Sequence, residues 1–299
     1  MRVRDAFFEK IYEKTKAGED IIIVSSDIGA PSLDDFRKDF PERFVNVGIA
    51  EQNSIAVAGG LALAGKKVIT YGLNPFPVTR AFDQVRNILS ALEIPITVTA
   101  LNAGTCSAEA GYTHIAVENM SIMRTLNNVV VINPSDTLIS ERLVDELLNN
   151  PKPRYVQFDK YIDGNWIDDN SINFEYGFVS EGEGDIAVVT YGIHAHELRK
   201  HKVNAKVIDC YCLPINENKF IDEMKGISRI ITVEDSVASG GIGSMVLEIL
   251  NDNGITIPVE RMAINKQKEY SDLFLNREMM WQREEIDMEN LFRKISGRA

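Results

Sequence analysis

The fold of this chain is decided by the stretch Asn46-Val47-Gly48-Ile49-Ala50-Glu51-Gln52-Asn53. Residues 44–46 predict a short strand that Gly48 ends, and the apolar, Ala- and Gly-rich run at 54–64 predicts a buried helix. Glu51 therefore lies at the start of a helix that is apolar nearly all round, where the helix dipole favours a carboxylate. Small side chains let another backbone or a cofactor come close, and a carboxyl group desolvated there is chemically poised.

Strands and helices alternate along the first half of the chain. We expect strands at residues 20–26, 67–71, 95–100, 129–134 and 154–158, and helices at 3–16, 80–91, 117–125 and 136–148. This alternation predicts an α/β fold with a doubly wound, mostly parallel sheet. Ligands of such sheets bind beside the carboxyl ends of the strands, where the loop at 27–32 lies.

The alternation stops where Gly, Asn, Asp and Ser concentrate, and it then restarts. We expect a first domain at residues 1–160, a linker at 161–175 and a second, smaller α/β domain at 176–299. The second domain has predicted strands at 186–191, 205–209, 229–233 and 258–262, and predicted helices at 216–224, 241–250 and 284–295. A further predicted helix has His194, His196 and His201 on its exposed face.

The composition is that of an ordinary soluble protein of 299 residues, with 44% hydrophobic and 25% charged residues. The formal net charge of -12 argues against a nucleic-acid surface, and the apolar runs are too short to cross a membrane. The first residues show no signal-peptide pattern, so we expect a cytoplasmic enzyme. The 3 cysteines have no zinc-ligand spacing and are expected to be reduced thiols.

The central stretch, with Ala58-Gly59-Gly60-Leu61-Ala62-Leu63-Ala64-Gly65 after it, closely resembles the pyrimidine-binding domain of the transketolase and deoxyxylulose-phosphate synthase group. The resemblance spans almost the whole chain, through Arg80-Ala81-Phe82-Asp83-Gln84-Val85-Arg86-Asn87, Thr113-His114, Ser121-Ile122-Met123-Arg124, Ile231-Thr232-Val233-Glu234-Asp235 and Gly240-Gly241-Ile242-Gly243-Ser244. Enzymes of this group use thiamine diphosphate. The resemblance implies a thiamine-diphosphate-binding pyrimidine domain followed by a transketolase C-terminal domain.

The resemblance gives Glu51 the central catalytic role on the cofactor. A carboxyl group bound to the ring nitrogen of the aminopyrimidine stabilises the imino tautomer, which removes the proton from the reactive carbon. Phe76 fits the family's aromatic stacking position, although a core phenylalanine, or a shift of that position to Leu73 or Tyr71, stays open. The predicted cofactor-binding set also contains Asp27, Ile49 and Arg80, with a structural ion pair as the alternative role of Arg80.

His114 is expected to face the substrate and to move protons on the donor ketose, as the matching histidine does in related enzymes. Ala110 stands where these enzymes usually have an acidic residue that contacts a sugar hydroxyl. Lys160 loosely matches an arginine that binds sugar phosphate, and a solvated linker lysine is the alternative. Ser32 completes the predicted substrate-binding set.

The glycine turn at 240–243 resembles a loop that holds phosphate. However, Val246 replaces the third glycine of a dinucleotide fingerprint. In related proteins this turn packs the C-terminal domain, and we expect the same here.

Related enzymes bind the diphosphate and its divalent metal through a Gly-Asp-Gly turn on another domain, and this sequence has no Gly-Asp-Gly. The resemblance therefore implies a separate N-terminal transketolase subunit that holds the diphosphate and Mg²⁺ (or Ca²⁺), with no metal ligand on this chain. We expect an α2β2 heterotetramer whose active site forms at the subunit interface. The implied reaction transfers a two-carbon ketol unit from a ketose or ketose phosphate to an aldose.

Other functions stay open. A β-type subunit of a 2-oxoacid dehydrogenase E1, or another decarboxylating thiamine diphosphate synthase, has the same architecture, but the motifs at 49–53 and 80–87 favour transketolase. A non-catalytic interaction subunit is disfavoured because Glu51 is retained. An unrelated two-domain nucleotide binder is disfavoured because the phosphate fingerprint is incomplete.

Overall fold

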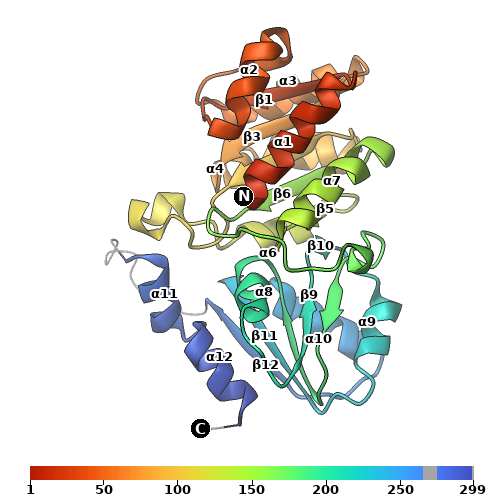
Figure 1. Ribbon diagram of the computed structural model, residues 1–299, viewed down its shortest axis with the longest axis vertical. Coiled ribbons are helices and arrows are strands. Elements are labelled where there is room, and N and C mark those ends of the chain that lie inside the picture. The colour runs from red at the N-terminus through yellow and green to blue at the C-terminus, as the bar shows by residue number, and fades with distance from the viewer. Residues whose placement is uncertain (265–274, 298–299) are drawn as a thin grey trace. The chain divides into compact units, whose positions relative to one another are not determined.

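The computed structural model describes residues 1–264 and 275–297, which form two compact units (Figure 1). The first unit contains Met1–Ala103 and Thr125–Asn165, and the second contains Gly104–Arg124 and the described residues from Trp166 onward. The segment Gly104–Arg124 therefore belongs with the C-terminal part of the chain, although its neighbours in sequence on both sides belong to the first unit.

The first unit is built on a sheet whose neighbouring strands run parallel, in the order β5-β6-β4-β3-β1-β2. The strands are β1 (Ile21–Ser25), β2 (Phe44–Asn46), β3 (Lys67–Leu73), β4 (Thr97–Leu101), β5 (Val130–Ile132) and β6 (Arg154–Phe158). Every residue of β1 and β6 is buried, as expected for strands covered on both faces. The predicted doubly wound, mostly parallel sheet is confirmed.

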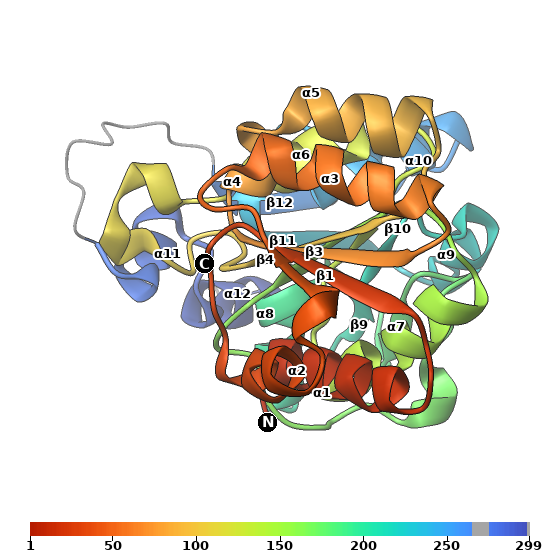
Figure 2. The ribbon, with the colours of Figure 1, turned by 90° about the horizontal axis from the view of Figure 1, so that it is seen from above.

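Helices cover both faces of this sheet, with α3 and α5 on one face and α1, α2 and α7 on the other (Figure 2). The helical segments are α1 (Val3–Lys16), η1 (Pro31–Leu33), α2 (Asp34–Asp39), η2 (Pro41–Arg43), α3 (Glu51–Leu63), α4 (Phe76–Thr79), α5 (Phe82–Val85), η3 (Arg86–Ala91) and α7 (Thr137–Asn149). Asp136 caps α7 by accepting a hydrogen bond from the backbone N–H of Leu138.

The predicted helix at 80–91 differs from the structure, which has consecutive helical segments beginning at Phe76. Pro77 lies in the first turn of α4, where a residue without a backbone N–H sacrifices no helical hydrogen bond. The prolines on either side of Phe76 therefore start the helical region earlier than the apolar pattern indicated.

The sheet of the second unit has the strand order β12-β11-β8-β9-β7. Among these described strands, β7 and β9 pair antiparallel and the other neighbours pair parallel. The strands of the unit are β7 (Val179–Glu181), β8 (Ile186–Thr190), β9 (Lys206–Asp209), β10 (Cys212–Leu213), β11 (Arg229–Val237) and β12 (Val259–Ile264).

Helices also pack against this second sheet, with α8 and α10 on opposite faces (Figures 1 and 2). The helical segments are η4 (Ala108–Ala110), η5 (Tyr112–His114), α6 (Asn119–Arg124), η6 (Asp169–Ser171), α8 (Gly192–Arg199), α9 (Glu217–Glu223), α10 (Ile242–Asp252), α11 (Arg277–Glu284) and α12 (Met288–Ile295). The predicted helix at 284–295 is interrupted, because Glu285 adopts a φ of 59° and Asp287 caps α12 with its carboxylate.

The prediction that His194 and His196 lie on an exposed helix face is wrong. Both side chains are fully buried, and the His194 ring stacks on Trp281 with 4.3 Å between centroids. His194 Nε2 also lies 2.8 Å from the backbone oxygen of Ile286. His194 is covered by residues of α11 and of the turn after it, and the ring centroid of His196 lies 6.5 Å from that of Trp166. The local sequence indicates neither contact. His201 is exposed, as predicted.

The three cysteine thiols are buried, and none of them forms a disulfide. Burial raises the pKa of the Cys210 thiol well above its ordinary value, so this thiol is not activated as a nucleophile. In the described part of the chain, no helix combines the length and apolar character needed to cross a membrane.

A cluster of aromatic rings attaches α1 to the sheet of the first unit. The ring centroid of Phe8 lies 5.0 Å from that of Tyr71 on β3 and 6.3 Å from that of Phe158 on β6. Phe7 adds centroid distances of 5.2 Å to Phe8 and 5.3 Å to Phe158. All four rings are fully buried, so ring contacts add to apolar burial in holding α1.

Phe8→Ala is expected to destabilise the first unit by about 3–5 kcal/mol, the range for removing a buried aromatic ring. Urea unfolding followed by far-UV circular dichroism measures the effect. Tryptophan fluorescence would not report on the first unit, because Trp166 and Trp281, the two tryptophans, lie in the second unit. The control is Leu92→Ala at an exposed side chain, which should change stability by less than about 0.5 kcal/mol. Equal effects of the two substitutions would contradict the packing role of Phe8.

Candidate active site

Most of the predicted site residues follow the carboxyl end of a strand in the first unit. Taken in the order β1, β2, β3 and β6, the residues that follow these strands are Asp27, Glu51, Phe76 and Lys160. The strands are parallel, so their carboxyl ends lie at one edge of the sheet. The structure therefore places these four residues at the same edge of the first unit.

Glu51 is the first residue of α3 and is almost completely buried, with 4% of its surface exposed. The helix packs closely because it contains small residues: a Cβ added to Gly59 would lie 3.0 Å from the side chain of Ile88. Glu51 Oε2 accepts a hydrogen bond of 2.7 Å from Nη1 of Arg80. A desolvated carboxylate is thus oriented by a neighbouring cation.

Arg80 joins Glu51 to an aromatic ring. Its guanidinium carbon lies 4.3 Å from the ring centroid of Phe76, and 45% of its side-chain surface is exposed. Gln52 Nε2 donates to the backbone oxygen of Arg80 at 3.1 Å. The structure therefore brings Glu51, Phe76 and Arg80 together and forms the ion pair considered for Arg80. Tyr71, considered as another stacking residue, is fully buried in the core.

Asp27 and Ile49 lie at the same edge with local contacts of their own. Asp27 adopts a φ of 57° and accepts a hydrogen bond of 2.9 Å from Asn46 Nδ2, which connects the ends of β1 and β2. Ile49 is a large apolar residue with an exposed side chain.

Ser32 and Lys160 were predicted to bind substrate. Ser32 lies in η1, and its Oγ atom is buried without a hydrogen-bond partner among the described residues. Lys160 follows β6, and its Nζ atom lies 5.0 Å from the ring centroid of Tyr161. The structure therefore gives Lys160 a cation–π contact of its own chain.

His114 lies in the second unit, in the segment Gly104–Arg124. Gly111 adopts a φ of 83°, and its carbonyl accepts from the backbone N–H of His114 at 2.9 Å, so a left-handed glycine shapes this turn. His114 is half-buried, and its Nδ1 lies 2.9 Å from Thr113 Oγ1. Ala110 in η4 and Tyr112 in η5 are exposed.

Glu118 is a polar residue of this segment that the motifs did not point to. It follows His114 by four positions and comes directly after the apolar residues 115–117. Burial raises the pKa of its carboxyl above the usual value. Groups with shifted pKa values gather at functional sites, so Glu118 is a candidate site residue. The sequence signal that could have indicated it is an acidic residue directly after an apolar stretch.

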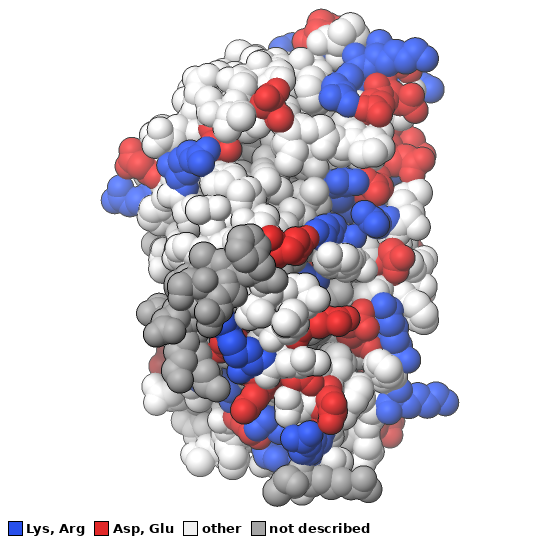
Figure 3. Space-filling view, turned by 90° about the vertical axis from the view of Figure 1, so that its left-hand side faces the viewer, with Lys and Arg blue, Asp and Glu red and all other residues white. Residues whose placement is uncertain are grey.

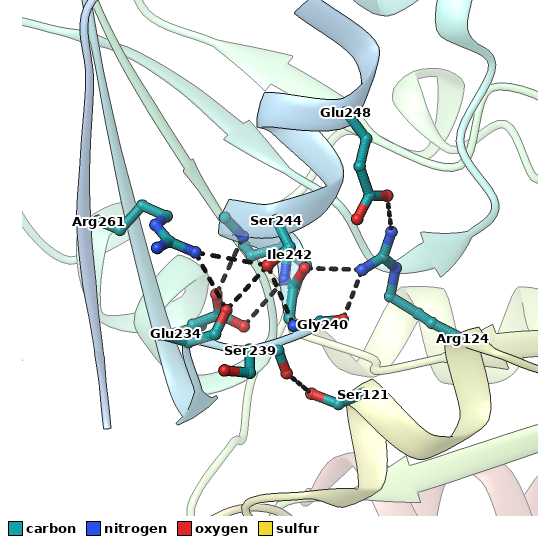
Figure 4. A network of polar contacts seen from close by, with 12 residues as sticks. Ser121, Arg124, Glu234, Ser239, Gly240, Ile242, Ser244, Glu248 and Arg261 are labelled. Atoms are coloured by element: carbon teal, nitrogen blue, oxygen red, sulfur yellow. Dashed lines mark hydrogen bonds and ion pairs between the residues drawn. The ribbon is translucent and has the colours of Figure 1, made fainter. Parts of the chain in front are cut away.

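The glycine turn at 240–243 holds a carboxylate of this chain (Figure 4). Glu234 accepts hydrogen bonds of 2.9 Å from the backbone N–H groups of Ile242 and Gly243, the first residues of α10. A Cβ on Gly241 would collide with this carboxylate. Burial raises the pKa of Glu234, although hydrogen bonds from Ser236 and from α10 oppose the rise. The turn therefore packs the second unit, as predicted.

Among the described residues, no group of three or more His, Cys, Asp or Glu side chains is placed to hold a metal ion. Figure 3 shows one face of the molecule, on which acidic and basic side chains are interspersed. The described residues of that face do not form the continuous basic surface that is typical of nucleic-acid binding.

The contacts of Glu51, Arg80 and Phe76 fit a flat, nitrogen-containing heterocycle. The planar guanidinium of Arg80 lies over Phe76 and donates to Glu51, which combines stacking with a hydrogen bond to a buried carboxylate. An aminopyrimidine ring makes the same two kinds of contact. In this structure the guanidinium of Arg80 makes both of these contacts.

Comparison with known proteins gives two family matches along the chain. The family described as transketolase, pyrimidine binding domain, matches residues 1–161, and that described as transketolase, C-terminal domain, matches residues 177–286. An apulose-4-phosphate transketolase subunit of Phocaeicola vulgatus is 28% identical over 86% of this chain and 86% of that protein. 1-Deoxy-D-xylulose-5-phosphate synthase of Caldanaerobacter subterraneus subsp. tengcongensis is 30% identical, with 97% of this chain matching 46% of that protein.

A solved structure described as split gene transketolase, inactive beta4 tetramer, is similar over 100% of this chain and 98% of its own chain. The TM-score is 0.82 and the sequence identity is 26%. The similarity thus includes both units. The chain belongs to the transketolase family, with a pyrimidine-binding domain followed by a transketolase C-terminal domain.

Proposed function

We propose that this chain is one subunit of a thiamine diphosphate-dependent transketolase that transfers a two-carbon ketol unit from a ketose to an aldose. The observation that carries the proposal is the buried carboxylate of Glu51, bonded to Arg80 beside the ring of Phe76. Burying a carboxylate is unfavourable unless fixed donors compensate it, so its place at the carboxyl edge of the sheet supports a chemical role.

Thiamine diphosphate, when bound, supplies a nucleophilic carbon and an electron sink for the cleavage of a carbon–carbon bond. Glu51 would bind a pyrimidine nitrogen and hold or release a proton there, in surroundings that strengthen the hydrogen bond. Phe76 would stack on the ring, and Arg80 would keep the Glu51 carboxylate oriented. Asp27 and Ile49 would complete the contacts of this chain with the cofactor.

A separate N-terminal subunit with a Gly-Asp-Gly turn would hold the diphosphate and Mg²⁺ (or Ca²⁺). The extent of similarity supports this division, because the chain matches 86% of the apulose-4-phosphate transketolase subunit and only 46% of a longer synthase. The split-gene relative is described as an inactive beta4 tetramer, which supports self-association of such a chain in isolation. The active assembly we propose is an α2β2 heterotetramer.

His114 would move protons on the donor ketose, and Lys160 would bind a substrate phosphate as a point charge. Ser32 would complete the substrate-binding set, since its Oγ has no hydrogen-bond partner among the described residues. Ala110 has no polar group where relatives usually have an acid, so the site should tolerate donors with an altered hydroxyl near the reacting carbonyl.

A decarboxylating synthase is the second candidate, because the 30% identity to 1-deoxy-D-xylulose-5-phosphate synthase extends over 97% of the chain. Such an enzyme takes a 2-oxoacid as donor and releases carbon dioxide, whereas ketol transfer from a ketose releases none. The amount of carbon dioxide formed with each donor therefore separates the two candidates.

The purified chain alone is expected to show no measurable ketol transfer. Transfer should appear when the N-terminal subunit, thiamine diphosphate and Mg²⁺ are added together, because the two subunits would each hold part of the cofactor. A coupled assay of aldose extension measures the reaction, and omission of each component in turn is the control. Tight, Mg²⁺-dependent binding of thiamine diphosphate by this chain alone in calorimetry would contradict the proposed division.

Glu51→Gln should lower turnover of the assembled enzyme by at least about a hundredfold, the scale for losing a positioned acid–base group. The glutamine keeps the size of the side chain and the half-exposed Arg80 can be solvated, so the melting temperature should change little. Glu42→Gln, at an exposed side chain, is the matched control. Near-wild-type turnover of Glu51→Gln at saturating cofactor would remove this residue from the proposed role.

Ala110→Asp should increase the preference for ketoses that have the hydroxyl next to the reacting carbonyl in the usual configuration. The reason is that an introduced carboxylate would gain a hydrogen bond to the matching hydroxyl and would stay unpaired with other donors. The measurement is kcat/KM for two ketoses that differ at this hydroxyl, with Ala110→Asn as the uncharged control. An unchanged ratio would mean that position 110 does not face the sugar.

A further inference from the structure

Glu234 and Asp235 are neighbouring, buried carboxylates on β11 that bind different parts of the second unit. Successive side chains leave a strand on opposite faces, so the two acids meet different partners. Glu234 accepts from the first residues of α10. Asp235, of which 5% is exposed, accepts instead from Thr105 in the segment that contains His114.

Both carboxylate oxygens of Asp235 are used. Oδ2 accepts from the backbone N–H of Thr105 at 3.0 Å, and Oδ1 accepts from the Thr105 hydroxyl at 2.8 Å. Oδ1 also accepts from Nε1 of Trp281 at 2.9 Å, and Nη2 of Arg277 lies 3.4 Å from Oδ2. Charge-assisted hydrogen bonds are stronger than neutral ones, so this carboxylate joins α11 firmly to the start of the His114 segment.

The start of the segment is also fitted closely around Asp235. Gly104 adopts a φ of 55°, and a Cβ there would collide with the carboxylate and the backbone oxygen of Asp235. The carbonyl of Gly104 accepts from the backbone N–H of Ala116 at 2.9 Å, and Val117 accepts from the N–H of Val237 at 3.0 Å. The loop that contains His114 is thus closed at its base and bonded to β11.

The far end of the segment is attached to the glycine turn (Figure 4). The hydroxyl of Ser121 donates to the backbone oxygen of Ser239 at 2.6 Å. Arg124 donates to the carbonyl of Gly241 at 2.9 Å and to the carboxylate of Glu248 at 2.7 Å. Both ends of the segment are therefore held by the second unit, and the exposed residues Tyr112 and Thr113 lie between these ends.

We infer that Asp235 is a positioning residue for His114. Its carboxylate fixes the base of the loop through Thr105, and it acts on the reaction through His114, which touches the substrate in the function proposed above. Loss of the carboxylate should loosen the loop and misplace His114, while the contacts of Glu51, which lie within the first unit, stay intact. The transketolase C-terminal domain thereby contributes to substrate handling through a defined hydrogen-bonded connection.

The first test measures the loop directly. Asp235→Asn keeps the side-chain size but has one acceptor oxygen, so either the Thr105 N–H or the Trp281 N–H loses its acceptor. Amide hydrogen exchange at residues 105–116 should become at least about tenfold faster, because the loop opens more often. The control is Asp222→Asn, an exposed acid on α9 that pairs with Lys225. Unchanged exchange in Asp235→Asn would overturn the inference.

The second test is a double-mutant cycle in the assembled enzyme. Asp235→Asn should lower kcat/KM for the donor about tenfold to a hundredfold, the scale of a small misplacement of a reacting group. The affinity for thiamine diphosphate should not change. In the His114→Ala background, Asp235→Asn should cause no further loss, since it acts through the missing side chain. A full additional loss in that background, or faster exchange with wild-type activity, would contradict the positioning role.

A milder variant covers the case in which Asp235→Asn does not fold. Thr105→Val removes the hydroxyl donor and keeps the backbone N–H. It should shift amide exchange and kcat/KM in the same direction as Asp235→Asn, by a smaller factor. Thr105→Ser keeps the hydroxyl and should leave both quantities at their wild-type values. If the assembled wild type shows no ketol transfer, the proposed function is wrong. The exchange measurement then decides separately whether Asp235 orders the loop.

Discussion

A buried carboxylate needs fixed hydrogen-bond donors, and this requirement organises both units of the chain. In the first unit Arg80 donates a hydrogen bond to Glu51 at the start of α3. In the second unit the backbone of α10 donates a hydrogen bond to Glu234, and the backbone of Thr105 donates one to Asp235. In each case glycine or alanine residues nearby let the elements approach closely enough to exclude water. These three buried acids therefore fix how helices and loops attach to the sheets.

The sheet and the start of α3 could be predicted because their signals are local. The four residues at 21–24 of β1 are apolar in succession, since helices cover both faces of the sheet. Gly48 and the Ala- and Gly-rich run after Glu51 identify a turn followed by a helix within a few residues of each other. The prediction that this helix is buried is wrong for one face, because Gln52, Ala56 and Leu63 are exposed in the structure. The hydrogen bond between Glu51 and Arg80 joins residues 29 positions apart. From the sequence motifs, an ion pair was only one of two roles considered for Arg80, the other being cofactor binding.

Other features depend on contacts between distant residues, which periodicity does not report. His194 occupies a helix with no clear apolar stripe, and it is covered by Trp281 and Ile286, up to 92 positions later. His196, on the same helix, has a ring contact with Trp166, 30 positions earlier. The membership of Gly104–Arg124 in the second unit rests partly on Asp235, which lies 130 positions after Thr105. A glycine-rich loop reads the same in sequence whether it belongs to the sheet before it or to a later domain.

The segment Gly104–Arg124 gives a physical reason for the two domains to share one chain. β4 of the first unit leads directly into this segment, but the hydrogen bonds that shape it come from β11 and the glycine turn. The first domain alone would leave the loop around His114 without the acceptor for the Thr105 N–H and without the partners of Arg124. An unpaired backbone donor or an unbonded guanidinium favours a solvated, irregular loop. The C-terminal domain is thus a structural requirement for a loop that its sequence neighbours cannot fold by themselves.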